Sequence, residues 1–411
     1  MIAQRIRRFS AIGAILISAA GSTAFPPSTQ ANASNAKPSP SPVEKANLKT
    51  EEAKPNSDWQ IVKVGVRDYL SVDNIAKFYG LLTNVEASGK TTVLSNARNQ
   101  LQFTSDSREA IINGVRNWLC FPIVAQDGKL LVSRIDLAKT IEPQLRPHMI
   151  QHTDKLQTVI VDAGHGGFDK GASSNEGLEK NYALDVSRRL RPLLQARGFK
   201  VILTRENDVF LPLEMRARIA NQTHDSIFVS IHFNSAAKPD ANGFEVFSLT
   251  PRGAPSTADD ALALSFVNMQ EGSPVDAQSF LLSACVYHSM LGHVSRFDRG
   301  IKRARFAVLR KTKIPAILVE GGFLSQADDS KLVASPDWRG KLAEAIAIGI
   351  ENYRNATERK QRPMLVADYH AQSAMGITIE DLAQPPTRLE TAPVPTASPD
   401  VEIEANPSHE P

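Results

Sequence analysis

Side chains that could do chemistry follow three apolar runs of the chain. The runs lead into Asp-Ala-Gly-His165-Gly-Gly, Ile-His232-Phe-Asn234-Ser and Val-Glu320-Gly-Gly, and a further acid, Glu179, opens a segment with helical periodicity. Open α/β sheets bind their ligands just beyond the carboxyl ends of the strands. We therefore expect these side chains to meet at one edge of a sheet.

Two histidines and one glutamate form a ligand set that many catalytic zinc sites use, with the fourth position left for water. Zinc lowers the pKa of that water toward about 7, and a separate carboxylate must then accept its proton and protonate the leaving amine. Glu320 can fill this role, because its strand end is expected near the other two. On residue type alone, each histidine could instead be a structural residue at a strand end.

Other candidate sites are weaker. Gly164-His165-Gly-Gly lacks the Gly-Lys-Ser/Thr ending of a P-loop and the spacing of a dinucleotide fingerprint. The remaining histidines lie in predicted linkers, in the tail, in a polar turn or five apart on a predicted helix, and we expect none to bind metal. Cys120 and Cys285 fall in different predicted domains. We expect them to be buried small hydrophobes, and their pairing in an oxidising compartment stays open.

The elements that position the site come from residues 156–355, where strand-like and helical patterns alternate. Strands are expected at 158–161, 201–203, 226–231, 244–249 and 316–319. Helices are expected at 179–197, 213–221, 258–269, 277–295 and 338–353. This alternation predicts an α/β three-layer sandwich, in which helices flank a mainly parallel, twisted central sheet.

A smaller α+β domain is predicted at residues 58–147. Tyr69-Leu-Ser-Val-Asp-Asn-Ile-Ala-Lys is echoed by Leu131-Val-Ser-Arg-Ile-Asp-Leu-Ala-Lys, and each copy reads as a short strand entering a helix that begins after serine. Strand-like runs at 91–94 and 99–103 lie between the copies, and Asn113-Gly114 between apolar residues predicts a hairpin.

The ends of the chain have a different composition. Residues 1–33 combine arginines, a short apolar run and Ala31-Asn-Ala33, which predicts a secretory signal peptide with the export route open; an uncleaved anchor is the alternative. Residues 34–57 and 362–411 are rich in proline and small or charged residues and are predicted to be a disordered linker and tail. The net charge of +3 on 411 residues gives no general basic field, so no nucleic-acid partner is expected.

The motifs of residues 156–353 occur in an order that resembles a known family. They are Val161-Asp-Ala-Gly-His165-Gly-Gly, Glu179-Lys, Leu203-Thr-Arg205, Arg216 with Ala220-Asn221, Ser230-Ile-His232-Phe-Asn234-Ser and Val319-Glu320-Gly-Gly-Phe-Leu-Ser. They are similar to those of N-acetylmuramoyl-L-alanine amidases of the AmiC or CwlV type, which carry the zinc amidase 3 domain. Residues 58–147 loosely resemble the copper amine oxidase N-terminal-like, or stalk, domain, which implies a spacer or a module that contacts the cell wall.

The amidase resemblance implies that His165, Glu179 and His232 bind Zn²⁺ and that Glu320 is the catalytic carboxylate. Asn234, Arg205 and Arg216 match further family positions and are candidates for substrate binding. The implied reaction is hydrolysis of the amide between the lactyl group of N-acetylmuramic acid and L-alanine, during cell-wall remodelling or daughter-cell separation.

The implied partners are peptidoglycan and an envelope activator or wall-anchoring protein. The implied location is the periplasm or cell envelope, with no stable membrane span after signal cleavage. Three alternatives remain: a zinc hydrolase that acts on a different amide, a non-catalytic peptidoglycan-binding adaptor, and a protein whose main function lies in residues 58–147.

Overall fold

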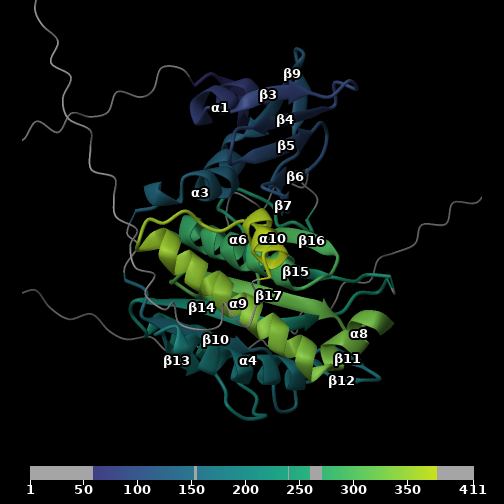
Figure 1. Ribbon diagram of the computed structural model, residues 1–411, viewed down its shortest axis with the longest axis vertical. Helices are drawn as coiled ribbons and strands as arrows, with labels where there is room; N and C mark the ends of the chain where they lie inside the picture. The colour runs from purple at the N-terminus through teal and green to yellow at the C-terminus, as the bar shows by residue number, and fades with distance from the viewer. Residues whose placement is uncertain (1–58, 152–154, 239, 260–270, 377–411) are drawn as a thin grey trace, which may run out of the picture. The chain divides into compact units, whose positions relative to one another are not determined.

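The computed structural model describes residues 59–151, 155–238, 240–259 and 271–376 (Figure 1). All of these described residues belong to one compact unit. The predicted signal peptide and linker lie outside the described residues, and so does most of the helix expected at 258–269. Among the described helices, none is long and apolar enough to cross a membrane.

A mixed sheet forms the centre of the fold. In the described residues it has 11 strands, in the order β13-β10-β14-β17-β15-β16-β7-β6-β5-β4-β3. The pairs β13–β10, β10–β14, β14–β17 and β15–β16 are parallel, whereas β15 runs antiparallel to β17. The strands of the C-terminal part are β10 (Thr158–Ala163), β13 (Lys200–Leu203), β14 (Ser226–Asn234), β15 (Phe244–Leu249), β16 (Asp298–Ala304) and β17 (Ala316–Phe323).

Helices cover both faces of these six strands, as the predicted sandwich requires. Helices α4 (Glu179–Ala196), α6 (Asp276–His293) and α9 (Pro336–Thr357) pack on one face (Figure 1). Helices α5 (Leu213–Asn221) and α7 (Ala307–Lys311) contact the other face. The α/β class and the helices expected at 179–197 and 213–221 are confirmed. The short strands β11 (Ser173–Ser174) and β12 (Gly177–Leu178) precede α4, and α8 (Ala327–Ala334) follows β17.

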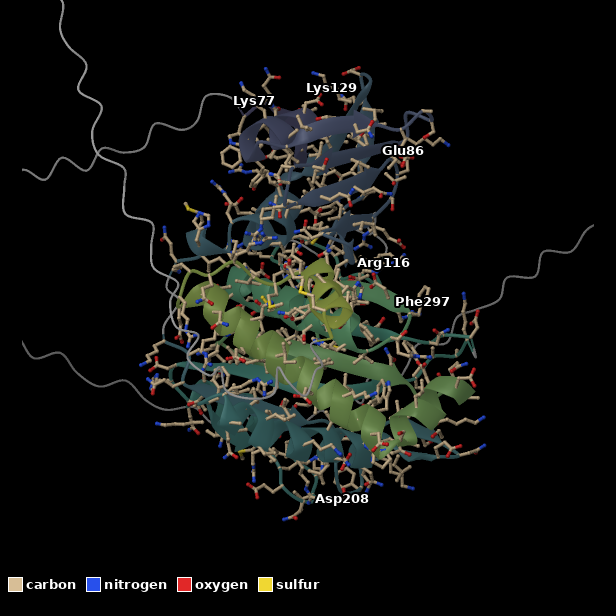
Figure 2. The ribbon with its side chains drawn as sticks, in the orientation of Figure 1. Lys77, Glu86, Arg116, Lys129, Asp208 and Phe297 are labelled. Carbon is tan, nitrogen blue, oxygen red and sulfur yellow. The ribbon has the colours of Figure 1, made fainter. Side chains whose placement is uncertain are left out.

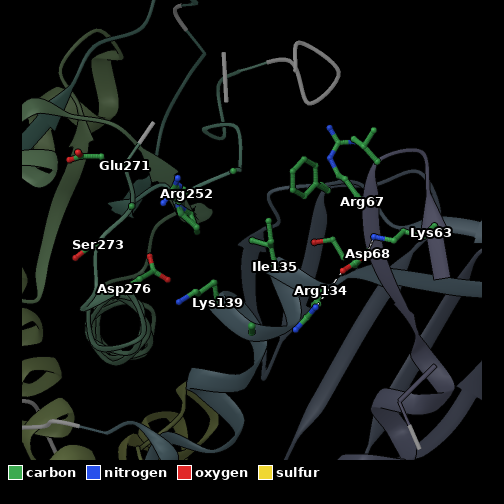
Figure 3. Close-up of a pocket in the computed structure, with 17 residues that line it drawn as sticks. Lys63, Arg67, Asp68, Arg134, Ile135, Lys139, Arg252, Glu271, Ser273 and Asp276 are labelled. Atoms are coloured by element: carbon green, nitrogen blue, oxygen red, sulfur yellow. Dashed lines mark hydrogen bonds and ion pairs between the residues drawn. The ribbon is translucent and has the colours of Figure 1, made fainter. Parts of the chain in front are cut away.

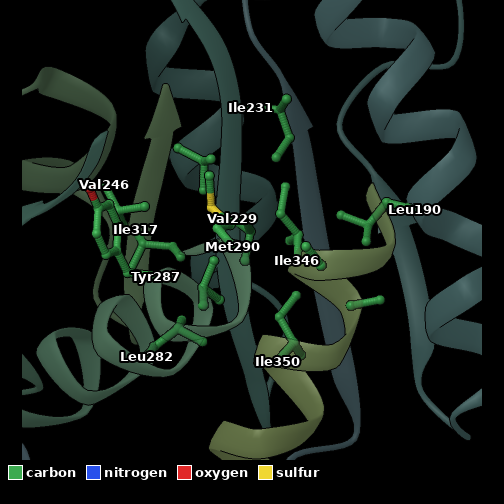
Figure 4. Close-up of a cluster of buried hydrophobic side chains, with 14 of the residues drawn as sticks. Leu190, Val229, Ile231, Val246, Leu282, Tyr287, Met290, Ile317, Ile346 and Ile350 are labelled. Atoms are coloured by element: carbon green, nitrogen blue, oxygen red, sulfur yellow. The ribbon is translucent and has the colours of Figure 1, made fainter. Parts of the chain in front are cut away.

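Alternation along each central strand builds two separate cores. On β10, Val159 and Val161 belong to the cluster under α4, α6 and α9, whereas Ile160 belongs to the cluster on the α5 and α7 side. Strand β14 does the same, with Val229 on the first side and Phe228 on the second. Figure 4 shows the first cluster, where side chains of α6 and α9 meet those of the strands. Both faces of these strands are buried, so their sequences read as continuous apolar runs.

The N-terminal module begins with β1 (Ile61–Val64), β2 (Arg67–Ser71), α1 (Val72–Tyr79), β3 (Leu82–Val85), β4 (Thr91–Ser95), β5 (Gln100–Thr104), β6 (Glu109–Ile112) and β7 (Val115–Trp118). It continues with β8 (Val124–Gln126), β9 (Lys129–Ser133), α2 (Arg134–Asp136), η1 (Leu137–Ile141), α3 (Glu142–Leu145) and η2 (Pro147–Met149).

The predicted repeat corresponds to two equivalent strand–helix turns in this module. Strands β2 and β9 pair antiparallel, and each ends in a serine whose Oγ accepts a hydrogen bond from a backbone N–H in the first helical turn. Asn113 and Gly114, both with positive φ, form the hairpin between β6 and β7. The resemblance of this module to copper amine oxidase N-terminal-like domains stays a prediction.

The two modules share one sheet, which the sequence patterns do not indicate. Strand β7 pairs parallel with β16 through Asn117 and Ile301. The Trp118 indole donates to the carbonyl of Arg299 at 2.9 Å. Buried Arg303 forms an ion pair with Asp276 at 2.8 Å and donates to the carbonyl of Lys139 at 2.6 Å. Arg303 and Asp276 both belong to the C-terminal part, so the bond from Arg303 to Lys139, together with the contacts of Asn117 and Trp118, couples the two modules.

A cavity of about 830 Å³ lies at this junction (Figure 3). Arg67, Arg134 and Lys139 line it from the N-terminal module, and Arg252 and Glu271 line it from the C-terminal part. None of the predicted site residues lines it, so this cavity is separate from the predicted site. Cys120 and Cys285 are free and buried, as expected of small apolar residues.

The beginning of the predicted tail is folded, which corrects the expectation of disorder from residue 362. Helix α10 (Val366–Ala374) contacts α6, and Tyr369 is buried. The backbone N–H of Val366 donates to His288 Nδ1 at 3.1 Å, and the Asn352 side chain both donates to and accepts from the backbone of Met364. The apolar residues 364–366 and Tyr369 provide this anchoring. The rest of the predicted tail lies outside the described residues.

Candidate metal centre

Three of the predicted residues meet at the carboxyl end of the sheet. His165, Glu179 and His232 each offer one ligand atom, and these atoms lie within 4.8 Å of one another. His165 Nε2 and His232 Nδ1 both face Oε1 of Glu179, at 3.1 and 2.8 Å. Two imidazole nitrogens and a carboxylate oxygen therefore meet at one place, as in the three-ligand set of a catalytic zinc site.

The left-handed backbone at His165 and the absence of a Cβ atom at Gly164 let the two histidines approach each other. His165 has φ +57°, a left-handed conformation that aims its ring back toward the sheet. At Gly164, a Cβ atom would lie 2.4 Å from the His232 ring. Side chains of the protein also fill the space beside Gly321, where a Cβ atom would meet Leu342 and Phe233.

Glu179 is fixed from several sides at the start of α4. Its Oε2 accepts from the backbone N–H of Ala172 at 2.7 Å, and its Oε1 accepts from that of Phe233 at 3.1 Å. Burial opposes ionisation of this carboxyl, but the hydrogen bonds and charges of His165 and His232 outweigh burial and lower its pKa. Glu179 is therefore ionised at neutral pH, as a metal ligand must be.

His165 has a second acidic neighbour on the other side of its ring. Its Nδ1 lies 2.9 Å from Oδ2 of Asp169. Burial disfavours the charged ring, but Glu179 and Asp169 together outweigh burial and raise the pKa of His165. A carboxylate at the nitrogen that does not bind the metal commonly orients a metal-binding histidine. Sequence reasoning missed Asp169, although its position four residues after His165 was a usable signal.

Glu320 lies beside this group because of strand register. It is the direct partner of His232 across β14 and β17, and of Glu245 across β15 and β17. Its side chain is 8% exposed, and its Oε2 has no hydrogen-bond partner among the described residues. Burial, then the charges of Glu179 and Glu245, raise its pKa well above the usual range, against an opposing effect of Lys302. A buried carboxyl with a free oxygen and a raised pKa is poised for proton transfer.

Arg205 and Arg216, predicted as substrate-binding candidates, lie beneath the group rather than on its surface. Both are buried. Arg205 donates to the carbonyls of Ala163 and Gly164 at 2.9 and 2.7 Å. Arg216 pairs with Asp162 at 2.7 Å and donates to the carbonyl of His165 at 2.7 Å. Apart from the Asp162 carboxylate, the partners named are backbone carbonyls of the protein itself, which favours a positioning role for both arginines.

Asn234, the third substrate-binding candidate, faces a cluster that sequence reasoning missed. Its amide donates to Glu245 Oε1 at 2.8 Å, and the other Glu245 oxygen pairs with Arg299 at 3.0 Å and with Lys302. Glu245 is buried. The sequence places Glu245 at the start of a predicted strand, which does not mark it as a site residue. Only the antiparallel pairing of β15 with β17 brings it next to Glu320.

The sequence matches the amidase 3 family, N-acetylmuramoyl-L-alanine amidase, over residues 159–352. It is 34% identical over 268 residues to N-acetylmuramoyl-L-alanine amidase AmiC of Neisseria meningitidis, covering 58% of this chain and 64% of that protein. It is 30% identical over 244 residues to the amidase AmiA of Salmonella typhimurium, covering 54% of this chain and 84% of that protein.

Among solved structures, N-acetylmuramoyl-L-alanine amidase AmiC2 of Nostoc punctiforme is 34% identical, with 48% of this chain and 96% of that chain covered and a TM-score of 0.40. The chain therefore spans less than two thirds of the Neisseria relative and most of the Salmonella relative. All four residues of the His–Glu–His group and its neighbouring carboxyl fall within the matched range.

Replacing Arg216 with lysine should weaken the site without removing a ligand. Lysine cannot contact Asp162, Ala163 and His165 at once, so the His165 loop loses its support and Zn²⁺ affinity should fall about 10- to 100-fold. Zinc titration by calorimetry measures the change. Arg218→Lys, an exposed position on the same helix, is the matched control. Equal zinc affinity in both variants would contradict the positioning role.

Zinc affinity should also depend on pH in one direction. The pKa of His165 is raised, so protons compete with the metal as pH falls through that pKa, at about tenfold per pH unit for each proton displaced. Glu179, with a lowered pKa, stays ionised in the same window. Competition titrations between pH 8 and 5.5 should show affinity falling steadily, and Asp169→Asn should move the fall to lower pH. A flat profile would show that the histidines do not hold the metal.

Proposed function

The chain belongs to the N-acetylmuramoyl-L-alanine amidase family, and from this we propose that it is a zinc-dependent hydrolase of peptidoglycan. The bond cleaved is the amide between the lactyl group of N-acetylmuramic acid and the L-alanine of the stem peptide. The single observation that supports this most strongly is the His165–Glu179–His232 group with Glu320 in direct register beside it.

The donor set fits Zn²⁺ better than a hard cation. Two imidazole nitrogens and one carboxylate oxygen suit zinc, whereas Mg²⁺ and Ca²⁺ prefer oxygen ligands throughout. His165, Glu179 and His232 would hold the ion, and Asp169 would orient His165. When bound, zinc would supply Lewis acidity that activates a water and polarises the scissile carbonyl.

Glu320 would move the protons of the reaction. It would accept a proton from the attacking water and deliver it to the L-alanine nitrogen as the carbon–nitrogen bond breaks. Because burial raises the pKa of Glu320, the ionised carboxylate is a stronger base than an exposed glutamate, and the protonated form is available to the leaving group. Its free Oε2 is not engaged by any described residue, so it can reach the reacting atoms.

Neighbouring residues would keep this geometry without touching the substrate. Arg205 and Arg216 hold the backbone around His165 from below, and Ser230 donates to Asp162 at 2.7 Å on the strand that carries His232. Lys302 and Arg299 neutralise Glu245, so that Glu320 does not face an unpaired carboxylate. Such outer partners are expected to affect metal affinity and rate rather than specificity.

The substrate places the protein outside the cytoplasm. A wall-degrading amidase must reach peptidoglycan in the periplasm or cell envelope, in agreement with the signal peptide expected at residues 1–33. The N-terminal module would act as a spacer or wall contact that moves with the catalytic part, because the two share one sheet. Export, the activator partner and the physiological role in remodelling or cell separation belong to the same proposal.

Glu320→Gln should abolish most of the activity while leaving the metal bound. The amide cannot accept the proton of water, so release of new L-alanine amino termini from purified peptidoglycan should fall about 10²- to 10⁴-fold. Wild type and variant are assayed with zinc and with chelator, and zinc content is measured in parallel. Glu86→Gln, on the N-terminal module (Figure 2), is the control.

Two results would contradict the proposal. Unchanged activity in Glu320→Gln would remove Glu320 from proton transfer. Zinc binding by the wild type with no L-alanine termini released would leave the metal site standing but exclude this amide as the substrate. In that case the adaptor and the hydrolase of a different amide become the functions to test.

A further inference from the structure

Two phenylalanines stack on each other at the surface next to the candidate metal centre. Phe168 lies three residues after His165 in the loop that follows β10, and Phe210 lies in the loop between β13 and α5. Their ring centroids are 4.2 Å apart and their planes 30° from parallel. Phe168 is 79% exposed and Phe210 41% exposed. We call this pair the aromatic platform.

The platform is held rigidly by bonds between its two loops. The backbone N–H of Gly167 donates to Asp208 Oδ1 at 2.7 Å. Lys180, from α4, donates to the carbonyl of Gly167 at 2.8 Å and pairs with Asp208 at 2.6 Å. The backbones also touch, because a Cβ atom at Gly166 would lie 2.2 Å from the carbonyl oxygen of Val209. The rings are therefore presented at a fixed place.

Folding does not explain this exposure. Neither ring belongs to a described hydrophobic cluster, and the neighbouring Val209, Leu213 and Met215 are exposed as well. A group of exposed apolar side chains beside a reaction site marks a surface that binds something. Aromatic ring faces suit a ligand with flat apolar faces and polar edges, and a pyranose ring is such a ligand.

Charge is distributed unequally on the two sides of the centre. The platform lies at the β13 and β10 end of the catalytic strands, where Asp169 lies beside His165 and Asp208 is paired with Lys180. On the other side of β17 lie β15 and β16, where Arg299 and Lys302 together face the single carboxylate Glu245. Figure 2 shows Asp208 and Phe297, of the loop before β16, far apart along the sheet.

We propose that the aromatic platform binds the glycan strand, with the apolar face of a sugar ring stacked on Phe168 and Phe210. The stem peptide, which carries carboxylates, then runs across Glu320 toward Arg299 and Lys302. A neutral glycan suits an apolar surface whose neighbouring acids already have partners, and an anionic peptide suits the side with Arg299 and Lys302. Phe168 and Phe210 are thus specificity-determining residues. The inference rests on the proposed function, because it assigns the two arms of that substrate.

Phe168→Ala is the decisive variant, because so exposed a side chain can be removed without disturbing the core. Substrates carry the same stem peptide on either a single N-acetylmuramic acid or a long glycan strand, and a third set keeps the long glycan but shortens the stem. The kcat/KM of Phe168→Ala should fall about tenfold on long glycan. The loss should be smaller on the single sugar and should not change with stem length.

Two further variants make the result specific. Phe168→Trp keeps a ring face and should retain the preference for long glycan, which a merely structural role would not predict. Leu82→Ala removes an equally exposed apolar side chain, 78% exposed, from the N-terminal module and should leave all substrates unchanged. A loss in Phe168→Ala that is equal on every substrate, or that follows stem length, would overturn the assignment.

A binding measurement separates this inference from the proposed function. Stem-free glycan strands are titrated by calorimetry into the Glu320→Gln protein, with and without Phe168→Ala. If the aromatic platform binds glycan, the double variant should bind glycan about tenfold more weakly than Glu320→Gln alone. If wild type releases no L-alanine but glycan binding still depends on Phe168, the proposed function fails and the platform stands. If glycan binding ignores Phe168, or no glycan binds, the platform is wrong.

Discussion

One buried ion pair, between Asp162 and Arg216, holds together the strands and the helix that position the candidate metal centre. Asp162 is the next-to-last residue of β10 and is 1% exposed. It accepts hydrogen bonds from Arg216 of α5 at 2.7 Å, from Thr204 after β13 at 2.6 Å and from Ser230 of β14 at 2.7 Å. Removing one partner from a buried pair typically costs about 3–5 kcal/mol, because the other charge is left uncompensated. This pair therefore fixes four elements at the point where the chain turns toward His165.

The site follows from placing polar residues at the ends of strands that are otherwise apolar. Along β14, Phe228, Ser230 and His232 point to the same side of the sheet, and along β17 Leu318 and Glu320 do so. The apolar members of these series pack under α5 and α7, whereas the last members extend beyond that layer. The order of the strands places the aromatic rings on the β13 side of the site and the basic groups on the β16 side.

Local patterns predicted the α/β class, helices α4 and α5, and the convergence of His165, Glu179 and His232, because each depends on a short segment. Contacts between segments that are distant in the sequence do not produce a pattern within either segment, so the sequence did not predict them. Glu245 joins the site only through the antiparallel β15, and the N-terminal module joins the sheet through β7 and β16, more than 180 residues apart in the chain. The sequence did not predict helix α10, because residues 362–411 as a whole have the composition of a disordered tail. The helix is nevertheless anchored through the buried Tyr369.

We propose that two histidines and a glutamate hold zinc at the end of this sheet. X-ray absorption at the zinc edge, measured on the zinc-loaded chain, tests it most directly. The expected spectrum has nitrogen and oxygen neighbours at about 2.0–2.1 Å and the outer scattering of two imidazoles, which falls to that of one imidazole in His232→Ala. A shell containing sulfur, or one that His232→Ala leaves unchanged, would contradict it.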